Sequence, residues 1–382
     1  MPAHPKDACE DIVEVVREFA RREIAPIADA LDESEELCPD IFRRLAKLDL
    51  LGITVPEEYG GSGLGAVAAA AVTEELAYVD PGTALSYIAH SILFLHNVAR
   101  NANDDVKKRY VPRCVSGELV AGLAMTEPGV GSDAAAMATT AVREGDDFVL
   151  DGTKMFITNG PIGDVFLLYA RAPRSDRSLS AFVVETRFPG LERGRKLRKM
   201  GMRSSPTGEI VLQGCRVPAA NLVGTEGGAI RPMMQNLEIE RVCLAAISLG
   251  IARACVDQAV RYAAERIQFG QPIIRFQAVS HKIADMHIHH RAATNLVYDA
   301  AQAVDAGERA RMAAAAAKVF ASETATRTAL DAVQILGGYG YIREFPVERL
   351  ARDAKLLEIG GGTSEILRNL IVSELEGSPR AR

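Results

Sequence analysis

The chain has 382 residues, and its 50 acidic and 44 basic residues give a formal net charge of −6. This acidic balance and the absence of tryptophan give no reason to expect nucleic acid as a partner. No apolar run approaches the ~18 residues that cross a membrane, so we expect no membrane span. The six cysteines are widely spaced, without a CxxC pair. We therefore expect a cytoplasmic protein without a disulfide framework or a metal site.

The first third of the chain is predicted to be helical. Ile12, Val15, Val16 and Phe19 recur at the spacing of one helix face. The alanine-rich stretch 66–77 has a high helix propensity. Further helices are expected over residues 41–48, 86–100 and 104–116. This pattern favours an N-terminal helical domain over residues 1–118.

The composition changes near Leu119. From there to about Gly228, short β-rich runs alternate with turns; the runs are 148–150, 166–169, 181–184 and 209–212, and one turn is Pro173–Ser178. Short strands at this spacing are typical of a small β-barrel or sandwich, which we expect over residues 119–226.

After Gly228 the chain is helical again. The long periodic segments are 237–268, 276–307, 308–336 and 364–376. Four such helices suggest a bundle, which we expect over residues 227–382. The predicted fold is thus an α+β multidomain protein with an N-terminal helical domain, a central β-barrel and a C-terminal four-helix bundle.

Two motifs admit a cofactor or metal interpretation but favour plainer ones. Residues 63–68 match the dinucleotide pattern GxGxxA, but no strand leads into them and no βαβ unit follows. His287, His289 and His290 are clustered, but the nearest carboxylate, on Asp285, points elsewhere on the expected helix. A surface loop and a packed or solvated helix face are the expected structures.

Glu240 lies in an apolar stripe of one predicted helix, between Leu237 and Leu244. A carboxylate in a core stripe costs several kcal/mol unless it is paired or protonated. Arg241 is adjacent, but neighbours in a helix do not face each other. Glu240 is therefore a candidate for chemistry. The alternative is a carboxylate near the start of the helix that still reaches water.

Three glycine-bearing segments could present backbone N–H groups to a phosphate or a flavin. They are Met125–Asp133 inside the β region, Lys154–Gly160 at the end of a strand, and Gln334–Gly340 at the end of a helix. Each segment alone is also explained as an ordinary loop, and the last one as a helix C-cap.

Together these motifs resemble the acyl-CoA dehydrogenase family, in the right order and over nearly the whole chain. The matching segments are PEEYGG at 56–61, TEPGVGSD at 126–133, KMFITNG at 154–160, MGMRSS at 200–205, ERIQFG at 265–270, and residues 334–340, 346–355 and 362–365. One such segment would carry little weight, but eight in order make a chance resemblance very improbable.

The resemblance implies FAD, bound between barrel and bundle, in a homotetramer built as a dimer of dimers. It implies that Thr126 and Thr158 contact the flavin ring and that Phe156 packs beside it. Ser132 would lie near the pyrophosphate or the substrate. The other residues implied to bind FAD, several of them across a subunit interface, are Met125, Gly131, Arg266, Phe269, Gln277, Gln334, Gly337, Gly338, Thr363 and Glu365.

One departure from the family concerns the catalytic base. Many members carry the catalytic glutamate in a Tyr-Glu-Gly-Thr-Ser stretch, where this chain has Gly360 and then Gly361 in place of the glutamate. The isovaleryl-CoA and long-chain types place the base on a bundle helix just before an arginine, which Glu240 and Arg241 match. The resemblance therefore implies Glu240 as the base, with Arg241, Gly360, Gly361 and Ser132 in the substrate site.

The reaction so implied is α,β-dehydrogenation of a saturated acyl thioester, with electrons passed to an electron-transferring flavoprotein. A backbone N–H near Gly361 and a ribityl hydroxyl would polarise the thioester carbonyl. The two glycines at 360 and 361 favour a short or branched acyl-CoA such as isovaleryl-CoA.

Three alternatives remain. An acyl group on an acyl carrier protein is suggested by a basic cluster of Arg193, Arg195, Lys196, Arg198 and Lys199. A flavin oxidase or monooxygenase could use the same fold. A non-catalytic paralogue is suggested by the loss of the common base at Gly361.

Overall fold

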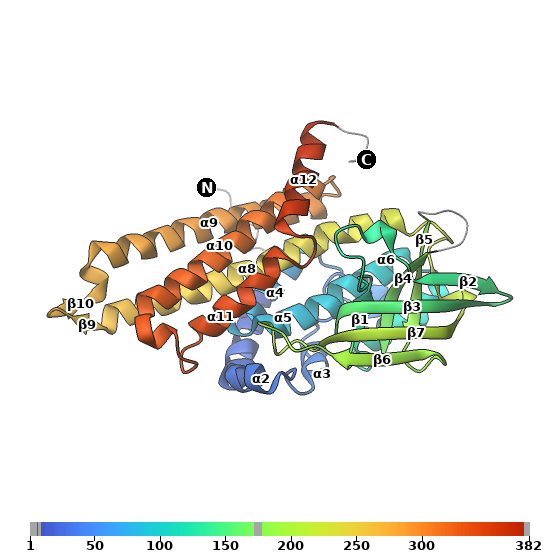
Figure 1. Ribbon diagram of the computed structural model, residues 1–382, viewed down its shortest axis with the longest axis horizontal. Helices are drawn as coiled ribbons and strands as arrows, with labels where there is room; N and C mark the ends of the chain where they lie inside the picture. Colours follow the sequence, from blue (N-terminus) through green and yellow to red (C-terminus); the bar gives the residue numbers. More distant parts are fainter. Residues whose placement is uncertain (1–5, 7–8, 172–177, 378–382) are drawn as a thin grey trace.

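The computed structural model describes residues 6, 9–171 and 178–377. A sheet lies at one end of the long axis and a two-stranded hairpin at the other, with long helices running between them (Figure 1). The turn expected at Pro173–Ser178 falls outside the described residues except for Ser178. In the described part of the chain, no helix is long and apolar enough to cross a membrane.

The helices expected in the first third all form, together with α2, which the sequence did not predict. They are α1 (Glu10–Phe19), α2 (Ala28–Ser34), α3 (Ile41–Ala46), α4 (Ala66–Val79), α5 (Pro81–Ile88), α6 (Asn97–Asn101) and α7 (Asp104–Val115). π-Helical turns over Ala89–His96 join α5 to α6. The expected helix over 86–100 therefore begins earlier, at Pro81, because the Asp80 carboxylate caps it by accepting the N–H of Thr83 at 3.0 Å.

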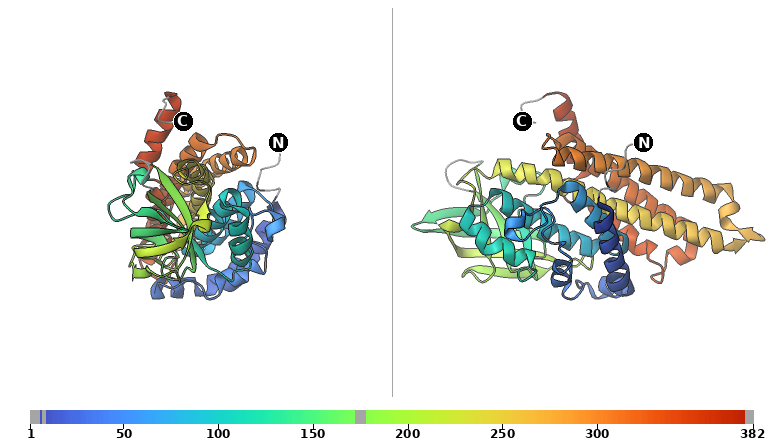
Figure 2. Two further views of the ribbon diagram at one scale, coloured as in Figure 1. Left: turned by 90° about the vertical axis from the view of Figure 1, so that its right-hand side faces the viewer. Right: turned by 180° about the vertical axis from the view of Figure 1, so that it is seen from behind.

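The middle of the chain forms one eight-stranded sheet. Its strands are β1 (Ala121–Ala124), β2 (Thr140–Glu144), β3 (Asp147–Thr158), β4 (Val165–Arg171), β5 (Leu179–Glu185), β6 (Leu191–Lys196), β7 (Thr207–Pro218) and β8 (Leu222–Val223). They pair in the order β6-β7-β3-β2-β4-β5-β8, and β1 adds to β4 in parallel. In the end-on view, N-terminal helices lie beside this sheet (Figure 2).

The predicted closed β-barrel is wrong, because the sheet's end strands, β6 and β8, do not pair with each other in the described part of the chain. Among the described residues, the two halves of the sheet are joined where β2 meets β4, through the pair Thr140 and Arg171. The sheet instead bends over its own core. Phe166 and Phe182 from one half pack in the same cluster as Phe148 from the other.

β4 shows why this part of the sequence lacks a clean alternation. Val165, Leu167 and Tyr169 face a core shared with the helical segment from Phe94 to Cys114. The intervening residues Phe166 and Leu168 face the core inside the bent sheet. Because both faces of β4 are covered, its sequence is a continuous apolar run, as in other doubly buried strands.

The C-terminal part is built on three long helices, α8 (Ile230–Glu265), α9 (Gln277–Asp305) and α10 (Arg311–Leu336). The hairpin β9 (Ile267–Gln268) and β10 (Gln271–Pro272) connects α8 to α9. α4 also packs along α8, and Gly250 makes this close approach possible, since a Cβ there would lie 2.5 Å from the Glu74 carbonyl oxygen.

Two shorter helices complete the chain. α11 (Val347–Ala354), which was not expected, packs on α8 and α10. The expected helix at 364–376 forms as α12 (Ser364–Leu375), but it projects from the long helices (Figure 1). α12 packs on α10 through Leu367, which meets Ala315 and Val319. The predicted domain limits at 118/119 and 226/227 stay predictions.

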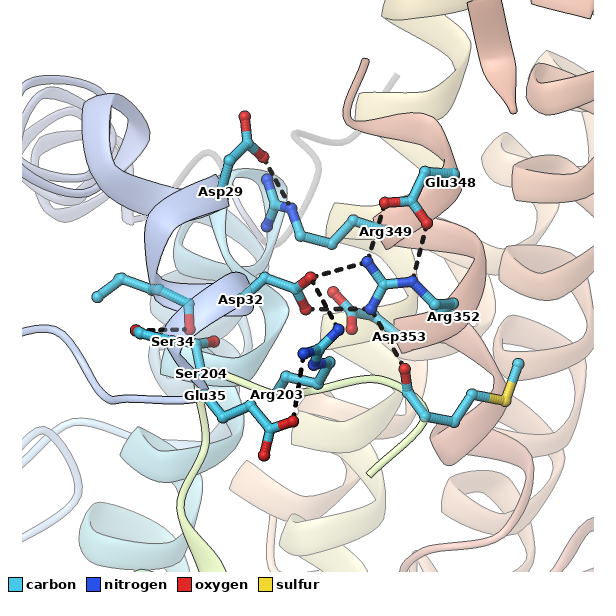
Figure 3. Close-up of polar contacts among 12 residues, drawn as sticks. Asp29, Asp32, Ser34, Glu35, Arg203, Ser204, Glu348, Arg349, Arg352 and Asp353 are labelled. Atoms are coloured by element: carbon cyan, nitrogen blue, oxygen red, sulfur yellow. Dashed lines mark hydrogen bonds and ion pairs between the residues drawn. The ribbon is translucent and has the colours of Figure 1, made fainter. Parts of the chain in front are cut away.

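A network of charged side chains, which we call the clasp, joins the three parts of the molecule (Figure 3). Asp32 on α2 is 7% exposed and receives two hydrogen bonds from Arg352 on α11, at 2.8 and 3.1 Å. Arg203, in the loop before β7, lies 3.8 Å from the same carboxylate and 3.2 Å from Glu35. Glu348 accepts two more bonds from Arg352, at 2.8 and 2.9 Å.

A second layer of buried carboxylates lies beneath the clasp. Asp80 accepts hydrogen bonds from the Ser204 hydroxyl at 2.8 and 2.9 Å, and it lies 3.5 Å from Arg349. Asp353 accepts the N–H of Met202, and its burial raises the pKa of its carboxyl to about 7. Through these contacts the loop at 200–205, one of the segments of the family resemblance, is tied to both helical parts.

We expect Arg352→Met to lower the stability of the protein by roughly 3 kcal/mol, because Asp32 and Glu348 would each lose a two-pronged partner. The matched control is Arg195→Met, since Arg195 is 74% exposed and its ion pair with Glu209 spans 4.0 Å. That change should cost less than about 1 kcal/mol. Thermal melting of both variants checks this expectation, and equal melting temperatures would contradict it.

Candidate active site and cofactor site

Glu240 is an interior residue of α8, ten positions after the helix begins at Ile230. Its side chain is buried on the same helix face as Leu244, with only 8% of the residue exposed. In the described part of the chain, Oε2 of Glu240 has no hydrogen-bond partner. The alternative of a carboxylate that reaches water at the helix start is therefore wrong, because α8 begins seven residues before the expected Leu237.

The surroundings of Glu240 hold its proton unusually tightly. Burial raises the pKa of the carboxyl to about 7, although the positive charges of Arg241 and Lys318 act in the opposite direction. A group with a pKa near neutrality can both take up and release a proton at working pH. Buried carboxyls with this property are common among general bases and acids.

The turn formed by residues 360–363 lies against Glu240. Gly361 has a φ of +67° and Gly362 a φ of +99°, values that side chains disfavour. A Cβ on Gly361 would stand 3.6 Å from Oε1 of Glu240, but only 2.3 Å from Cδ1 of Leu244. Leu244 thus fills the space that a side chain at 361 would need.

The structure brings three of the four predicted substrate-site residues to Glu240. Arg241 is buried, and its Nε donates to the carbonyl oxygen of Gly361 at 3.4 Å. Gly360 comes directly before Gly361 in the same turn. A Cβ added on Gly360 would come no closer than 3.6 Å to another atom. Ser132 is different: it is exposed in the loop after β1, and no described contact joins it to Glu240.

The loop Met125–Asp133 is anchored to the sheet by a buried ion pair. Nζ of Lys154, a residue with no exposed surface, lies 2.8 Å from Glu127 and donates to the Met125 carbonyl at 3.1 Å. The Glu127 carboxylate also accepts the N–H groups of Ala138 and Thr139, at 2.6 and 2.9 Å. The opposite charge on Glu127 only partly offsets burial, which lowers the pKa of Lys154 to about 8.

Phe156 lies beside this anchored loop, because the N–H of Met155 donates to the Thr126 carbonyl at 2.8 Å. β3 loses its regular pairing with β7 between Lys154 and Ile157, and Phe156 has a φ of +59°. The irregularity turns the ring outward, so that 61% of Phe156 is exposed. The paired end of the strand follows at Thr158, opposite Thr207.

The other predicted cofactor residues lie elsewhere. Arg266 and Phe269 are on or beside the β9–β10 hairpin, at the far end of the molecule from the sheet (Figure 1). A pocket of about 590 Å³ there is lined by Arg266, Gly337 and Gly338. The ring of Phe269 is 93% exposed. Within one chain, these residues are therefore remote from the loop at 125–133.

Four predicted cofactor residues have further positions. Gln334 is exposed near the end of α10, close in sequence to the pocket glycines, and Gln277 begins α9. Thr363 caps α12 by accepting the N–H of Ile366 at 3.3 Å, and Glu365 is exposed in the first turn of that helix. Thr363 thus connects the turn beside Glu240 to α12.

The clustered histidines have no metal-binding arrangement. Among the described residues, no group of three or more His, Cys, Asp or Glu side chains could hold a metal ion. Nδ1 of His289 lies 2.7 Å from the carbonyl oxygen of Asp285. His290 packs near Glu74 and Arg253, where burial lowers the pKa of its ring to about 4. At 63–68, the dinucleotide-like pattern leads into α4 and follows no strand.

Three family models match nearly the whole chain: the acyl-CoA dehydrogenase N-terminal domain at residues 6–118, the middle domain at 122–215 and the C-terminal domain at 228–376. The chain belongs to the acyl-CoA dehydrogenase family. It is therefore an FAD-dependent oxidoreductase of the class that acts on CH–CH groups.

Individual relatives agree with this assignment. Mitochondrial isovaleryl-CoA dehydrogenase of Oryza sativa subsp. japonica is 42% identical over 97% of this chain and 91% of its own. Butyryl-CoA dehydrogenase of Megasphaera elsdenii has a similar structure, with a TM-score of 0.93 and 35% identity over 96% of this chain and 97% of its own. A structure described as PigA with FAD and proline has a TM-score of 0.93 and 31% identity over the same shares.

The residues of this chain fit FAD. An exposed aromatic ring at Phe156 beside a loop with open glycines offers a flat apolar surface to a planar ring. Added Cβ atoms on Gly129, Gly131, Gly337 and Gly338 would meet nothing within 4 Å, so these backbones are open to a ligand. The guanidinium of Arg266, in the pocket beside the β9–β10 hairpin, suits a phosphate oxygen.

Sequence reasoning missed the ion pair of Lys154 and Glu127. This pair anchors the loop at 125–133, which is proposed to contact the cofactor. Both residues belong to segments that resemble the family, at 154–160 and 126–133. Their partnership could not be inferred, because they lie 27 positions apart in sequence and the pairing depends on how β3 crosses the loop.

We expect Lys154→Met to lower the free energy of unfolding by roughly 3 kcal/mol or more, because it leaves the Glu127 charge buried without its cation. The double change Lys154→Met with Glu127→Gln should recover part of that loss. Exposed Lys47→Met serves as the control and should cost less than about 0.5 kcal/mol. Thermal melting and the flavin content per chain measure both effects; an unchanged Lys154→Met protein would disprove the anchoring role.

Proposed function

We propose that the chain oxidises a saturated acyl-CoA to the trans-2-enoyl-CoA, with Glu240 as the catalytic base. The observation that carries this proposal is the geometry around Glu240. A buried carboxyl with an unpartnered oxygen faces a turn whose common catalytic position is occupied by Gly361. Glu240 is then the group able to accept the α-proton, and its neighbourhood matches the arrangement of the isovaleryl-CoA and long-chain types.

The residues divide the chemistry as follows. Glu240 accepts the α-proton on its free oxygen, and bound FAD supplies the acceptor for the β-hydride. The substrate carbonyl would lie at the turn, where the N–H groups of Ile359 and Gly360 already bind the Leu356 carbonyl at 2.9 and 2.8 Å. The next N–H along, on Gly361, is left to polarise the thioester oxygen. Arg241 holds the following peptide of the turn by donating to the Gly361 carbonyl.

The substrate we propose is a short or branched acyl-CoA such as isovaleryl-CoA. Gly360 leaves room for a small group beside the turn, because a Cβ there would make only ordinary van der Waals contact with Leu356, at 3.6 Å or more. A branch on the substrate's β-carbon can occupy space of this kind. The similarity to isovaleryl-CoA dehydrogenase supports this choice over a long straight chain.

The remaining assignments follow the same family pattern. We propose a homotetramer built as a dimer of dimers. This is supported by the position of the β9–β10 hairpin, where Arg266 and Phe269 lie, at the opposite end of the molecule from β3, which carries Phe156 (Figure 1). We propose an electron-transferring flavoprotein as the electron acceptor. A cytoplasmic location is supported by the six cysteines, all free thiols in the structure.

A carrier-protein substrate is less well supported by the structure. Arg193 donates to the Gly163 carbonyl at 2.6 Å, Lys196 to the Glu35 carbonyl at 2.5 Å and Lys199 to the Ser205 carbonyl at 2.8 Å. These bonds use three members of the basic cluster to hold the sheet, the N-terminal helices and the 200–205 loop together. The cluster is therefore explained without an acidic partner.

Anaerobic titration of the purified flavoprotein with acyl thioesters tests the function. We expect isovaleryl-CoA to bleach the flavin spectrum faster than butyryl-CoA and much faster than palmitoyl-CoA, because the missing side chain at Gly360 leaves room for a small branch. Acyl groups on a carrier protein should be no faster than their CoA esters. Flavin that no thioester bleaches, or that air reoxidises within one turnover, would move the assignment to a non-catalytic or an oxygen-using protein.

Glu240→Gln tests the base separately. The amide keeps the size of the side chain but accepts no proton, so the rate of flavin reduction should fall by about 10²–10⁴-fold while FAD stays bound. Glu238→Gln, two residues earlier on the same helix, is the control; Glu238 accepts the N–H of Ala310 at 3.2 Å. It should reduce flavin at nearly the normal rate. A Glu240→Gln protein that does the same would exclude Glu240 as the base.

A further inference from the structure

Lys318 is a buried cation that donates a hydrogen bond to a backbone carbonyl group. It lies on α10 with no exposed surface, and its Nζ donates to the carbonyl oxygen of Gly362 at 2.8 Å. Within the described residues, no carboxylate lies within ion-pair distance of this ammonium. Burying a charge without a direct counter-ion is costly, so the position calls for an explanation.

The carbonyl that Lys318 binds belongs to the turn beside Glu240. Two successive carbonyls of this turn are each held by a buried cation: that of Gly361 by Arg241 at 3.4 Å and that of Gly362 by Lys318 at 2.8 Å. The left-handed backbone at both glycines has no side chain of its own to restrain it. These two bonds from α8 and α10 therefore fix where the turn lies against the base.

We propose that Lys318 is a positioning residue for the dehydrogenation, holding the 360–363 turn in register with Glu240 while its positive charge stabilises the ionised carboxylate. This inference rests on the proposed role of Glu240 as the base. Lys318 touches neither the substrate nor the reacting atoms in this scheme. It acts through the turn and through the electrostatic field at Glu240.

The charged and titratable groups around the pair set the expected pH dependence. Arg241 on the same helix, Lys318 on α10 and Tyr169 on β4 act on Glu240. Besides Glu240 and Arg241, the groups acting on Lys318 are Glu358 in the turn after α11 and Glu365 on α12.

Burial raises the pKa of Glu240 to about 7 and lowers the pKa of Lys318 to about 8, so between these values the base is ionised and the lysine is charged. The base works only when ionised, so kcat/KM should rise with pH through the pKa of Glu240. Removal of the Lys318 charge would raise that pKa and move the rise to higher pH.

Two substitutions separate the charge from the hydrogen bond. Lys318→Gln keeps a donor for the Gly362 carbonyl but removes the charge; we expect the acid limb of kcat/KM to move up by about one pH unit, with a nearly normal plateau. Lys318→Met removes both; the limb should move equally, and kcat at the plateau should fall by up to about 100-fold because the turn is no longer held.

Two controls complete the experiment. Lys318→Arg keeps the charge and should keep the acid limb in place, and it remains informative if the neutral variants fold poorly. Ser322→Ala, one turn further along α10, removes a buried hydroxyl that binds only the Val319 carbonyl in the structure. It should leave the profile unchanged. Flavin content is measured for every variant.

An acid limb at the wild-type pH in both neutral variants would overturn the proposal, as would a loss in Lys318→Gln that is equal at every pH. Failure of the base assignment gives a different result. If Glu240→Gln reduces flavin at the normal rate, the proposed function is wrong whatever the Lys318 variants do. If Glu240→Gln is slow and Lys318→Gln has a normal profile, only the inference about Lys318 falls.

Discussion

The N-terminal helices, the sheet and the C-terminal helices of this chain meet at buried carboxylates, and the positions of these parts relative to one another depend on that junction. Asp32, Asp80 and Asp353 are each less than a tenth exposed. Each is bound by groups from a different part of the chain, so none can leave without exposing the others. Since a buried charge without a partner costs several kcal/mol, relative movement of the three parts is strongly disfavoured.

Burial has the same effect on the pKa of two carboxyls that have different roles. Asp353 and Glu240 are both buried, and burial raises the pKa of each to about 7. Asp353 has the Met202 N–H as a partner and serves the junction. Glu240 keeps one oxygen without a partner in the described part of the chain, facing a turn of glycines. Burial is common to both carboxyls. What distinguishes Asp353 from Glu240, the proposed base, is the hydrogen-bond partner.

Local sequence patterns predicted the helices well and the sheet closure badly. A helix can be predicted from apolar residues that recur every three to four positions, as around Phe19 or Leu244. Whether the ends of a sheet pair depends on distant strands, here β6 and β8, which leave no local trace. The depth of Glu240 was inferred from its apolar stripe, and the structure agrees.

The parts of the site that escaped prediction are long-range pairs. Lys318 is separated by 44 residues from the carbonyl it binds, and Lys154 by 27 from Glu127. Isolated lysines in sequence are expected on the surface. Only the packing of α10 against the turn, and of β3 against its loop, shows that these two are buried. Ser132 is a different case, since its role implied by the resemblance has no supporting contact in one chain.

The contact between Leu244 and position 361 has a consequence for the history of such pockets. A glutamate placed at 361 would collide with Leu244, and it would also require the left-handed backbone that glycine now provides. Returning the carboxylate to the turn therefore needs a smaller residue at 244 before the change at 361, since the reverse order produces the clash. The two arrangements of the proposed base are thus linked by an ordered set of substitutions, in which a change at 244 that does nothing for the base itself has to come first.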